Sequence, residues 1–149
     1  MKASESIKAF IKQCEGLRLT AYRCPSGVWT VGYGHTGTDV TPGKQISKAE
    51  AERLFEADLA RFEAELGAAV GHLGLRQGQY DALLSFAYNV GVRSLLASTL
   101  WRKVQANADD ASIPAEFSRW VYGTQRGRKV KLPGLIKRRA EEARRYASR

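Results

Sequence analysis

The sequence predicts an α+β fold in which most of the chain is helical. Apolar residues recur at helical spacing over most of the 149 residues, whereas residues 17–36 are rich in the Tyr, Val, Trp and Thr typical of strands. We therefore expect one domain over residues 1–149, with a first helix and a small antiparallel sheet at about 4–45 and a helical lobe at about 46–149. A cleft is expected where the two lobes meet.

The first helix is predicted over residues 4–15, with Ser4 or Ser6 as its N-cap. Its apolar face follows the i, i+3, i+4, i+7 pattern through Ile7, Phe10, Ile11 and Cys14. This pattern predicts that Cys14 packs in the core. Gly16 supplies the usual terminator, so Glu15 lies at the helix C-terminus. Because the helix dipole and nearby apolar groups disfavour an anion there, we expect Glu15 to keep its proton to higher pH and to be able to act as a general acid.

Residues 17–36 then predict a small antiparallel sheet with a turn at residues 25–27. Cys24 and Thr30 lie on either side of this turn, so a hairpin can direct both side chains toward Glu15. Cys24 has two interpretations: a small buried hydrophobe or a catalytic thiol. Thr30 is either a cross-strand packing residue or a catalytic hydroxyl. A reversible disulfide between Cys14 and Cys24 is a further alternative.

The helical lobe begins with a capping box of Ser47 and Glu50. The long helix that follows has an apolar stripe of Phe55, Leu59, Phe62 and Leu66. The acidic residues opposite the stripe are predicted to be a solvated face: Glu50, Glu52, Glu56, Asp58, Glu63 and Glu65.

Residues 77–89 predict the central core helix, which Asn89 and Gly91 end. Ser94 is expected to cap the next helix, which reaches Val104, and residues 114–121 predict a short helix. Residues 123–134 are expected to form a basic loop before a final helix at 135–146. In that helix Arg138 and Glu142 form an i, i+4 pair.

The net charge of +9 comes entirely from the C-terminal part of the chain. Residues 117–149 carry eleven Lys or Arg against two acids, while residues 1–116 carry thirteen of each. A basic face suggests a polyanionic partner: nucleic acid, an anionic cell envelope or a membrane surface. Because the region has no recognised nucleic-acid-binding motif, we expect no nucleic acid partner.

Several classes of protein and site are excluded by composition. No apolar run is long enough to span a membrane, and the start does not resemble a secretory signal, so we expect synthesis in a cytoplasm. Two cysteines make no disulfide framework, and no Cys/His cluster has zinc spacing. We therefore predict no metal and no cofactor.

Four blocks along the chain resemble the phage-type lysozymes, the muramidase endolysins of glycoside hydrolase family 24. They are EGLRLTAY (15–22), GVWTVGYGHTG (27–37), SFAYNVG (85–91) and GLIKRRAEE (134–142). The resemblance implies a lysozyme-like fold and a catalytic trio of Glu, Asp and Thr, which maps onto Glu15, Cys24 and Thr30. Cys therefore stands where the family usually has Asp. Whether this thiol is a nucleophile or positions water stays open.

Two further residues are candidates for substrate binding. His35 follows Gly32 and Gly34 and is either a structural residue bonded to its surroundings or a substrate contact. Asn89 is either a helix terminator or a side-chain amide that binds the N-acetyl groups of a glycan.

The function that the resemblance implies is hydrolysis of the β-1,4 bond between N-acetylmuramic acid and N-acetylglucosamine in bacterial peptidoglycan, causing host lysis. Such a protein, expected to be monomeric, accumulates in the host cytoplasm and reaches the wall in the periplasm through holin lesions. Its basic C-terminal face attracts the anionic envelope. The alternative is a non-hydrolytic peptidoglycan-binding domain, in which Cys24 marks the loss of catalysis.

Overall fold

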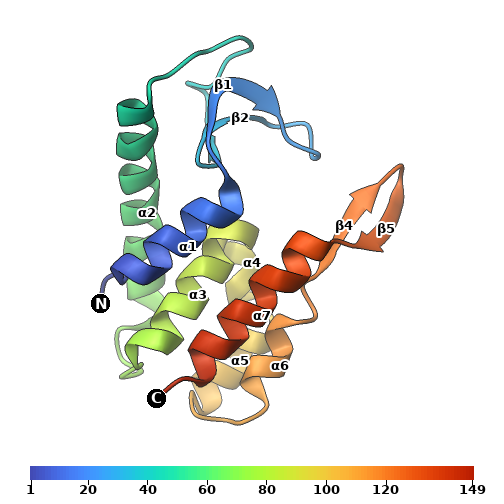
Figure 1. The fold of residues 1–149 in the computed structure, drawn as a ribbon. Helices are drawn as coiled ribbons and strands as arrows, with labels where there is room; N and C mark the ends of the chain where they lie inside the picture. The colour runs from blue at the N-terminus through green and yellow to red at the C-terminus, as the bar shows by residue number, and fades with distance from the viewer. The chain divides into compact units, whose positions relative to one another are not determined.

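The computed structural model describes residues 1–149 as seven helices and five strands (Figure 1). The chain divides into two compact units. The smaller unit is residues 9–61, and the larger unit combines residues 1–8 with residues 62–149. None of the helices combines the length and the apolarity that crossing a membrane requires.

The smaller unit contains the predicted sheet. It holds the end of α1 (Glu5–Glu15), the strands β1 (Arg18–Arg23), β2 (Trp29–Gly32) and β3 (His35–Thr36), and the start of α2 (Lys48–Val70). The strands pair antiparallel in the order β1-β2-β3, with Tyr22 opposite Thr30 and Val31 opposite His35. The predicted antiparallel sheet after the first helix is therefore confirmed.

Helix α1 begins with the cap that the sequence predicts and buries a narrower face than expected. The Ser4 hydroxyl accepts a hydrogen bond from the Ile7 backbone N–H at 3.1 Å. Ile7 and Ile11 are fully buried, but Cys14 is exposed, so its prediction as a core residue is wrong. The buried strip continues in steps of four residues, from Ile7 through Ile11 to the half-buried Glu15, and Cys14 is turned about 100° from Glu15 around the helix axis.

Helix α2 opens with the predicted capping box, because the Glu50 backbone N–H donates to the Ser47 hydroxyl at 3.1 Å. Phe55, Leu59 and Leu66 of the predicted stripe are buried. The acidic side is not simply solvated, however. Asp58 is buried and Glu52 is half-buried, and both take part in the polar contacts described below.

The larger unit is built around a buried helix, as predicted. Its elements are α3 (Gln77–Val90), α4 (Val92–Leu96), α5 (Thr99–Ala106), α6 (Ile113–Phe117), β4 (Tyr122–Gln125), β5 (Arg128–Lys131) and α7 (Pro133–Ala147). Every residue of α3 from 79 to 87 is buried, and the helix lies beside α7 (Figure 1). The crossing is close because Gly78 has no side chain: a Cβ there would lie 2.4 Å from the Arg145 carbonyl oxygen.

Two predictions for the larger unit are wrong. Ser94 lies inside the separate short helix α4, and Ser98 caps α5 by accepting a hydrogen bond from the Trp101 backbone N–H at 3.0 Å. Residues 123–134 are not an open loop, because β4 and β5 form an antiparallel hairpin that projects beyond the helices of this unit (Figure 1). Its turn places Arg126 (φ 50°) and Gly127 (φ 74°) in the left-handed region, as a type I′ turn requires.

Helix α7 docks through a buried charge network. The predicted Arg138–Glu142 ion pair is confirmed at 3.4 Å, but it lies in the interior, since Arg138 is 4% exposed and Glu142 0%. The Glu142 carboxylate also accepts from Arg139 and from the Ser85 hydroxyl, the latter at 2.6 Å. Charged groups so deeply buried must be paired and hydrogen-bonded, and here they hold α7 against α3.

Candidate active site

Glu15 ends helix α1 with its carboxyl group against the backbone of Gly34. Gly16 (φ +71°) terminates the helix. A Cβ built on Gly34 would lie only 2.8 Å from Oε2 of Glu15, closer than a side-chain carbon tolerates, and Gly34 has φ +81°. Only glycine accommodates both the close approach and this backbone conformation without strain. The turn between β2 and β3 thus packs against the Glu15 carboxyl, and the sequence analysis did not single out Gly34 as a neighbour of this candidate acid.

Cys24 and Thr30 lie next to each other, as the sequence predicted, on either side of the turn that joins β1 and β2. The half-buried Cys24 Sγ lies 2.8 Å from the Ser26 hydroxyl oxygen. This hydrogen bond, with smaller contributions from the backbone of Val28 and Ser26 and from the Thr30 hydroxyl, lowers the pKa of the Cys24 thiol below its ordinary value against the opposing effect of burial. Thr30 is buried, and its hydroxyl donates to the Val28 carbonyl at 3.0 Å.

Two nearby arginines that could have lowered the pKa of the Cys24 thiol stack on aromatic rings instead. The Arg18 guanidinium lies 4.7 Å from the centroid of the Tyr22 ring, and that of Arg23 lies 5.3 Å from the Trp29 ring. The pKa of the thiol therefore depends on neutral hydrogen-bond donors of its own turn rather than on cation pairing.

His35 is held between two carboxylates. Its Nδ1 lies 2.8 Å from Asp58 Oδ2 of α2, and its Nε2 lies 3.0 Å from Asp39 Oδ2. Burial disfavours the imidazolium, but the two carboxylates outweigh it and raise the pKa of His35 above its ordinary value; the pKa of Asp39 is correspondingly lowered by its bond to His35. Because both ring nitrogens have carboxylate partners, the contacts favour a structural role for His35 over a substrate contact.

A second polar cluster connects α1 to α2 inside the smaller unit. Lys12 pairs with Glu52, and its ammonium lies 5.0 Å from the centroid of the Phe55 ring. The Tyr33 hydroxyl donates to the other Glu52 oxygen at 3.0 Å. Lys12 lowers the pKa of Glu52, while burial and the Glu52 carboxylate raise the pKa of Tyr33. Glu52 and Asp58 thus fasten both ends of the 33–35 segment to α2, a role that the prediction of a solvated acidic face missed.

The predicted site residues are distributed over both units. Glu15, Cys24, Thr30 and His35 all belong to the smaller unit, whereas Asn89 lies near the end of α3 in the larger unit. No group of three or more His, Cys, Asp or Glu side chains in the chain could hold a metal ion.

The ion pairs of His35 predict a pH-dependent contribution to stability. Because the pKa of His35 is raised on folding, its contribution is complete below the pKa of an unfolded histidine and is lost as the pH rises through the folded pKa; on the acid side it is reduced when Asp39 protonates. His35→Asn should therefore lower the free energy of unfolding by about 1–3 kcal/mol near pH 5.5 and by less near pH 8.5, measured by urea denaturation. His72→Asn, at the chain's other, exposed histidine, is the matched control. An equal loss for His35→Asn at both pH values would contradict the assignment.

Comparison with known proteins identifies the family of the chain. The family described as phage lysozyme matches residues 12–142. An endolysin of Acyrthosiphon pisum secondary endosymbiont phage 1 is 40% identical over 142 residues, which cover 95% of this chain and 95% of that protein.

Two solved structures of similar proteins have the same fold over nearly the whole chain. The muramidase domain of SpmX from Asticaccaulis excentricus has a TM-score of 0.86 at 31% identity, covering 99% of both chains. An endolysin from Escherichia coli O157:H7 phage FAHEc1 has a TM-score of 0.83 at 33% identity, covering 98% of this chain and 93% of that one. The predicted lysozyme-like fold is thereby confirmed. The chain belongs to the phage lysozyme family, the endolysins that degrade bacterial peptidoglycan to lyse the host cell.

Proposed function

We propose that this endolysin hydrolyses the β-1,4 bond between N-acetylmuramic acid and N-acetylglucosamine, with Glu15 as the general acid and with Cys24 and Thr30 on the side of the attacking water. The observation that carries the proposal is the seating of the Glu15 carboxyl on Gly34 at the end of α1. A carboxyl group fixed in this way can deliver a proton to one oxygen of a bound glycan, and a proton donor in position accelerates such reactions by about 10²- to 10⁴-fold.

The bond is broken by proton transfer at one face of the sugar and water attack at the other. Glu15 protonates the glycosidic oxygen, which leaves as a hydroxyl group of the departing sugar. Water attacks the anomeric carbon, and its proton passes to the Cys24 thiolate; exchange with solvent then restores the Glu15 acid and the thiolate. Water attack from the opposite face inverts the anomeric configuration.

Support for the role of Cys24 comes from its lowered pKa, which raises the fraction of thiolate near neutral pH. We assign Thr30 to the same step, the attack of water on the sugar. Because its hydroxyl proton is directed to the Val28 carbonyl, the oxygen keeps a lone pair for a hydrogen bond from the attacking water. A direct attack by the thiolate would instead leave a sugar covalently bound to Cys24.

The β4–β5 hairpin is the part of the basic C-terminal region best suited to attract the anionic envelope. Its cations, Arg126, Arg128, Lys129 and Lys131, are all exposed. Arg138 and Arg139, by contrast, are buried in the charge network of α7 and cannot contribute directly. Attraction through exposed cations weakens as salt concentration rises. We place the action of the enzyme at the host cell wall, after accumulation in the cytoplasm and release through holin lesions.

Replacing the proposed acid tests the function. Glu15→Gln keeps the size of the side chain but cannot supply the proton, so kcat should fall at least about 10²-fold in release of reducing ends from purified peptidoglycan. Glu5→Gln, at the exposed first turn of the same helix, is the matched control and should be fully active. Activity retained in Glu15→Gln, or no release by the folded wild type, would refute the proposal.

The Gly34 contact can be separated from backbone strain. Gly34→Ala should lower kcat by about 10²-fold, because the new Cβ displaces the Glu15 carboxyl and small misplacements of a catalytic group are costly. Gly43 has nearly the same backbone conformation (φ +79°) but nothing within 4 Å of its would-be Cβ. Gly43→Ala should therefore share the loss of stability, about 1–2 kcal/mol, and keep its activity. Equal kcat values for the two variants would show that the contact does not position Glu15.

Substitutions of the thiol test its role. Cys24→Asp should keep activity and extend the pH profile to lower pH, because a carboxylate stays ionised further into acid than a thiolate, whereas Cys24→Ala should lose most activity. Cys14→Ala, which removes the exposed thiol, is the matched control. Full activity in Cys24→Ala would exclude a catalytic role, and a glycosyl adduct in the intact mass of the wild type during turnover would replace water attack by thiolate attack.

A further inference from the structure

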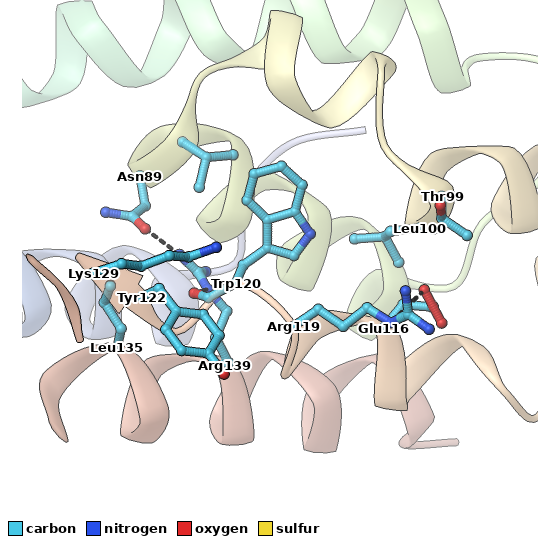
Figure 2. Close-up of a pocket in the computed structure, with 11 residues that line it drawn as sticks. Asn89, Thr99, Leu100, Glu116, Arg119, Trp120, Tyr122, Lys129, Leu135 and Arg139 are labelled. Atoms are coloured by element: carbon cyan, nitrogen blue, oxygen red, sulfur yellow. Dashed lines mark hydrogen bonds and ion pairs between the residues drawn. The ribbon is translucent and has the colours of Figure 1, made fainter. Parts of the chain in front are cut away.

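Asn89 lies at the edge of a cavity of about 500 Å³ that is formed entirely by the larger unit (Figure 2). The rings of Trp120 and Tyr122 and the ammonium of Lys129 also line the cavity. Asn89 is exposed, and it comes from the last turn of the buried helix α3. An exposed polar side chain thus projects from a buried helix at the rim of an aromatic cavity.

Beneath Asn89 lies Arg139, whose guanidinium is 1% exposed and held on every side. Its Nη1 pairs with the buried Glu142 carboxylate, and its Nε donates to the Trp120 carbonyl at 2.9 Å. The guanidinium lies 4.8 Å from the centroid of the Phe86 ring. Its remaining nitrogen, Nη2, donates to Oδ1 of Asn89. Arg139 is therefore a fixed donor and not a mobile surface charge.

The contact with Arg139 decides which way the Asn89 amide faces. A guanidinium carries only donors, so the Asn89 atom that meets it must be the oxygen. The amide nitrogen then points away from Arg139, as Figure 2 shows, and presents its N–H groups. An unrestrained asparagine offers either a donor or an acceptor to a ligand, whereas Asn89 offers a donor.

Most of the charged groups around the cavity are cations. Lys129 and Arg119 are exposed cations on its lining. Glu116 is the one acid there, and it is 5% exposed; it forms ion pairs with Lys103 at 3.2 Å and with Arg119 at 3.4 Å, although its Oε1 accepts no hydrogen bond. The groups left for a ligand are mostly donors, so the cavity favours a ligand group that carries an acceptor oxygen.

We propose that Arg139 is a positioning residue that fixes Asn89 as a hydrogen-bond donor, and that Asn89 thereby selects a carbonyl-type acceptor oxygen of the peptidoglycan strand. This inference rests on the proposed function, which supplies the ligand. Two parts of the strand carry such an oxygen: the glycan, through its acetamido and lactyl carbonyl groups, and the stem peptide, through its carboxylates and amide carbonyls. Both have the same chemistry, and the presence or absence of the peptide separates them.

Asn89→Asp tests the donor role without removing the partner of Arg139. The aspartate keeps an oxygen for Arg139 and replaces only the N–H groups by a second acceptor. We expect the midpoint of thermal unfolding to be unchanged or higher. Soluble glycan strands should bind at least about tenfold more weakly, because the site loses a hydrogen-bond donor and gains an acceptor oxygen that faces the acceptor oxygen of the ligand. Binding is measured by calorimetry in the Glu15→Gln background, with peptide-free and peptide-bearing strands. Asn107→Asp, at the chain's other asparagine, is the matched control.

The two ligands separate the two sources of the acceptor. Weaker binding of both kinds of strand assigns a carbonyl group of the glycan, and weaker binding of peptide-bearing strands alone assigns an oxygen of the stem peptide. Wild-type affinity of Asn89→Asp for both would overturn the proposal. The affinity measurement does not depend on catalysis. If the Glu15→Gln protein still cleaved the strands, the assignment of Glu15 as the acid would be wrong. The affinities of the wild-type and Asn89→Asp chains could then still be compared on strands that the enzyme cannot cleave.

Kinetics of the active chain distinguish positioning from a general structural role. Asn89→Asp should raise KM with kcat unchanged, as expected when an interaction is made equally in ground and transition states. Arg139→Lys frees the Asn89 amide to rotate, because a single ammonium cannot reach Glu142, the Trp120 carbonyl and Asn89 together. It should also raise KM, and Asn89→Asp should then add little further loss. Fully additive effects on KM would contradict the coupling of the two residues.

Discussion

The smaller unit depends on the contact between the Glu15 carboxyl and the backbone of Gly34. Side-chain volume at residue 34 and the position of the carboxyl are incompatible, since a Cβ would lie 2.8 Å from Oε2. Helix α1 must end at Gly16 to leave Glu15 at its terminus, and the β2–β3 turn must return to that end. The short sheet brings this turn back to the C-terminal end of α1.

The segment after β2 is held on the other side by charges of α2. Tyr33 and His35 flank Gly34 in sequence, and they bond to Glu52 and Asp58 respectively. The glycine that contacts the acid is thus fixed by the residues on both sides of it. Asn89 in the larger unit is held in a comparable way by the buried guanidinium of Arg139. In both units, a polar side chain at a helix end contacts neighbours that are themselves held by charged side chains.

Helical and strand periodicity predicted most of the architecture from sequence. The first helix, the sheet, the capping box at Ser47 and the buried helix α3 all depend on local pattern, and all are confirmed. The hairpin at 122–131 was missed because its turn is Arg-Gly, not the Asn-Gly or Asp-Gly that signals a type I′ turn. Cys14 was misplaced because one residue of helical rotation decides between a buried and an exposed side chain.

The polar contacts of the site could not be predicted, because they depend on packing between segments far apart in sequence. Periodicity shows that Asp58 lies opposite the apolar stripe of α2, but not that His35 covers that side. The same limit applies to Arg139, which the sequence analysis counted with the basic face. Gly34 was visible as part of a Gly-x-Gly-His motif, yet its partner is a side chain nineteen positions earlier, and only the fold brings the two together.

The most direct test of the mechanism is the fate of water during cleavage. Peptidoglycan is digested in water enriched in oxygen-18, and the released muropeptides are analysed by mass spectrometry. If Glu15 protonates the leaving oxygen while Cys24 and Thr30 direct water to the sugar, every new reducing end will carry one labelled oxygen. Unlabelled anhydro ends would show that a hydroxyl of the sugar attacks in place of water, and would contradict the account.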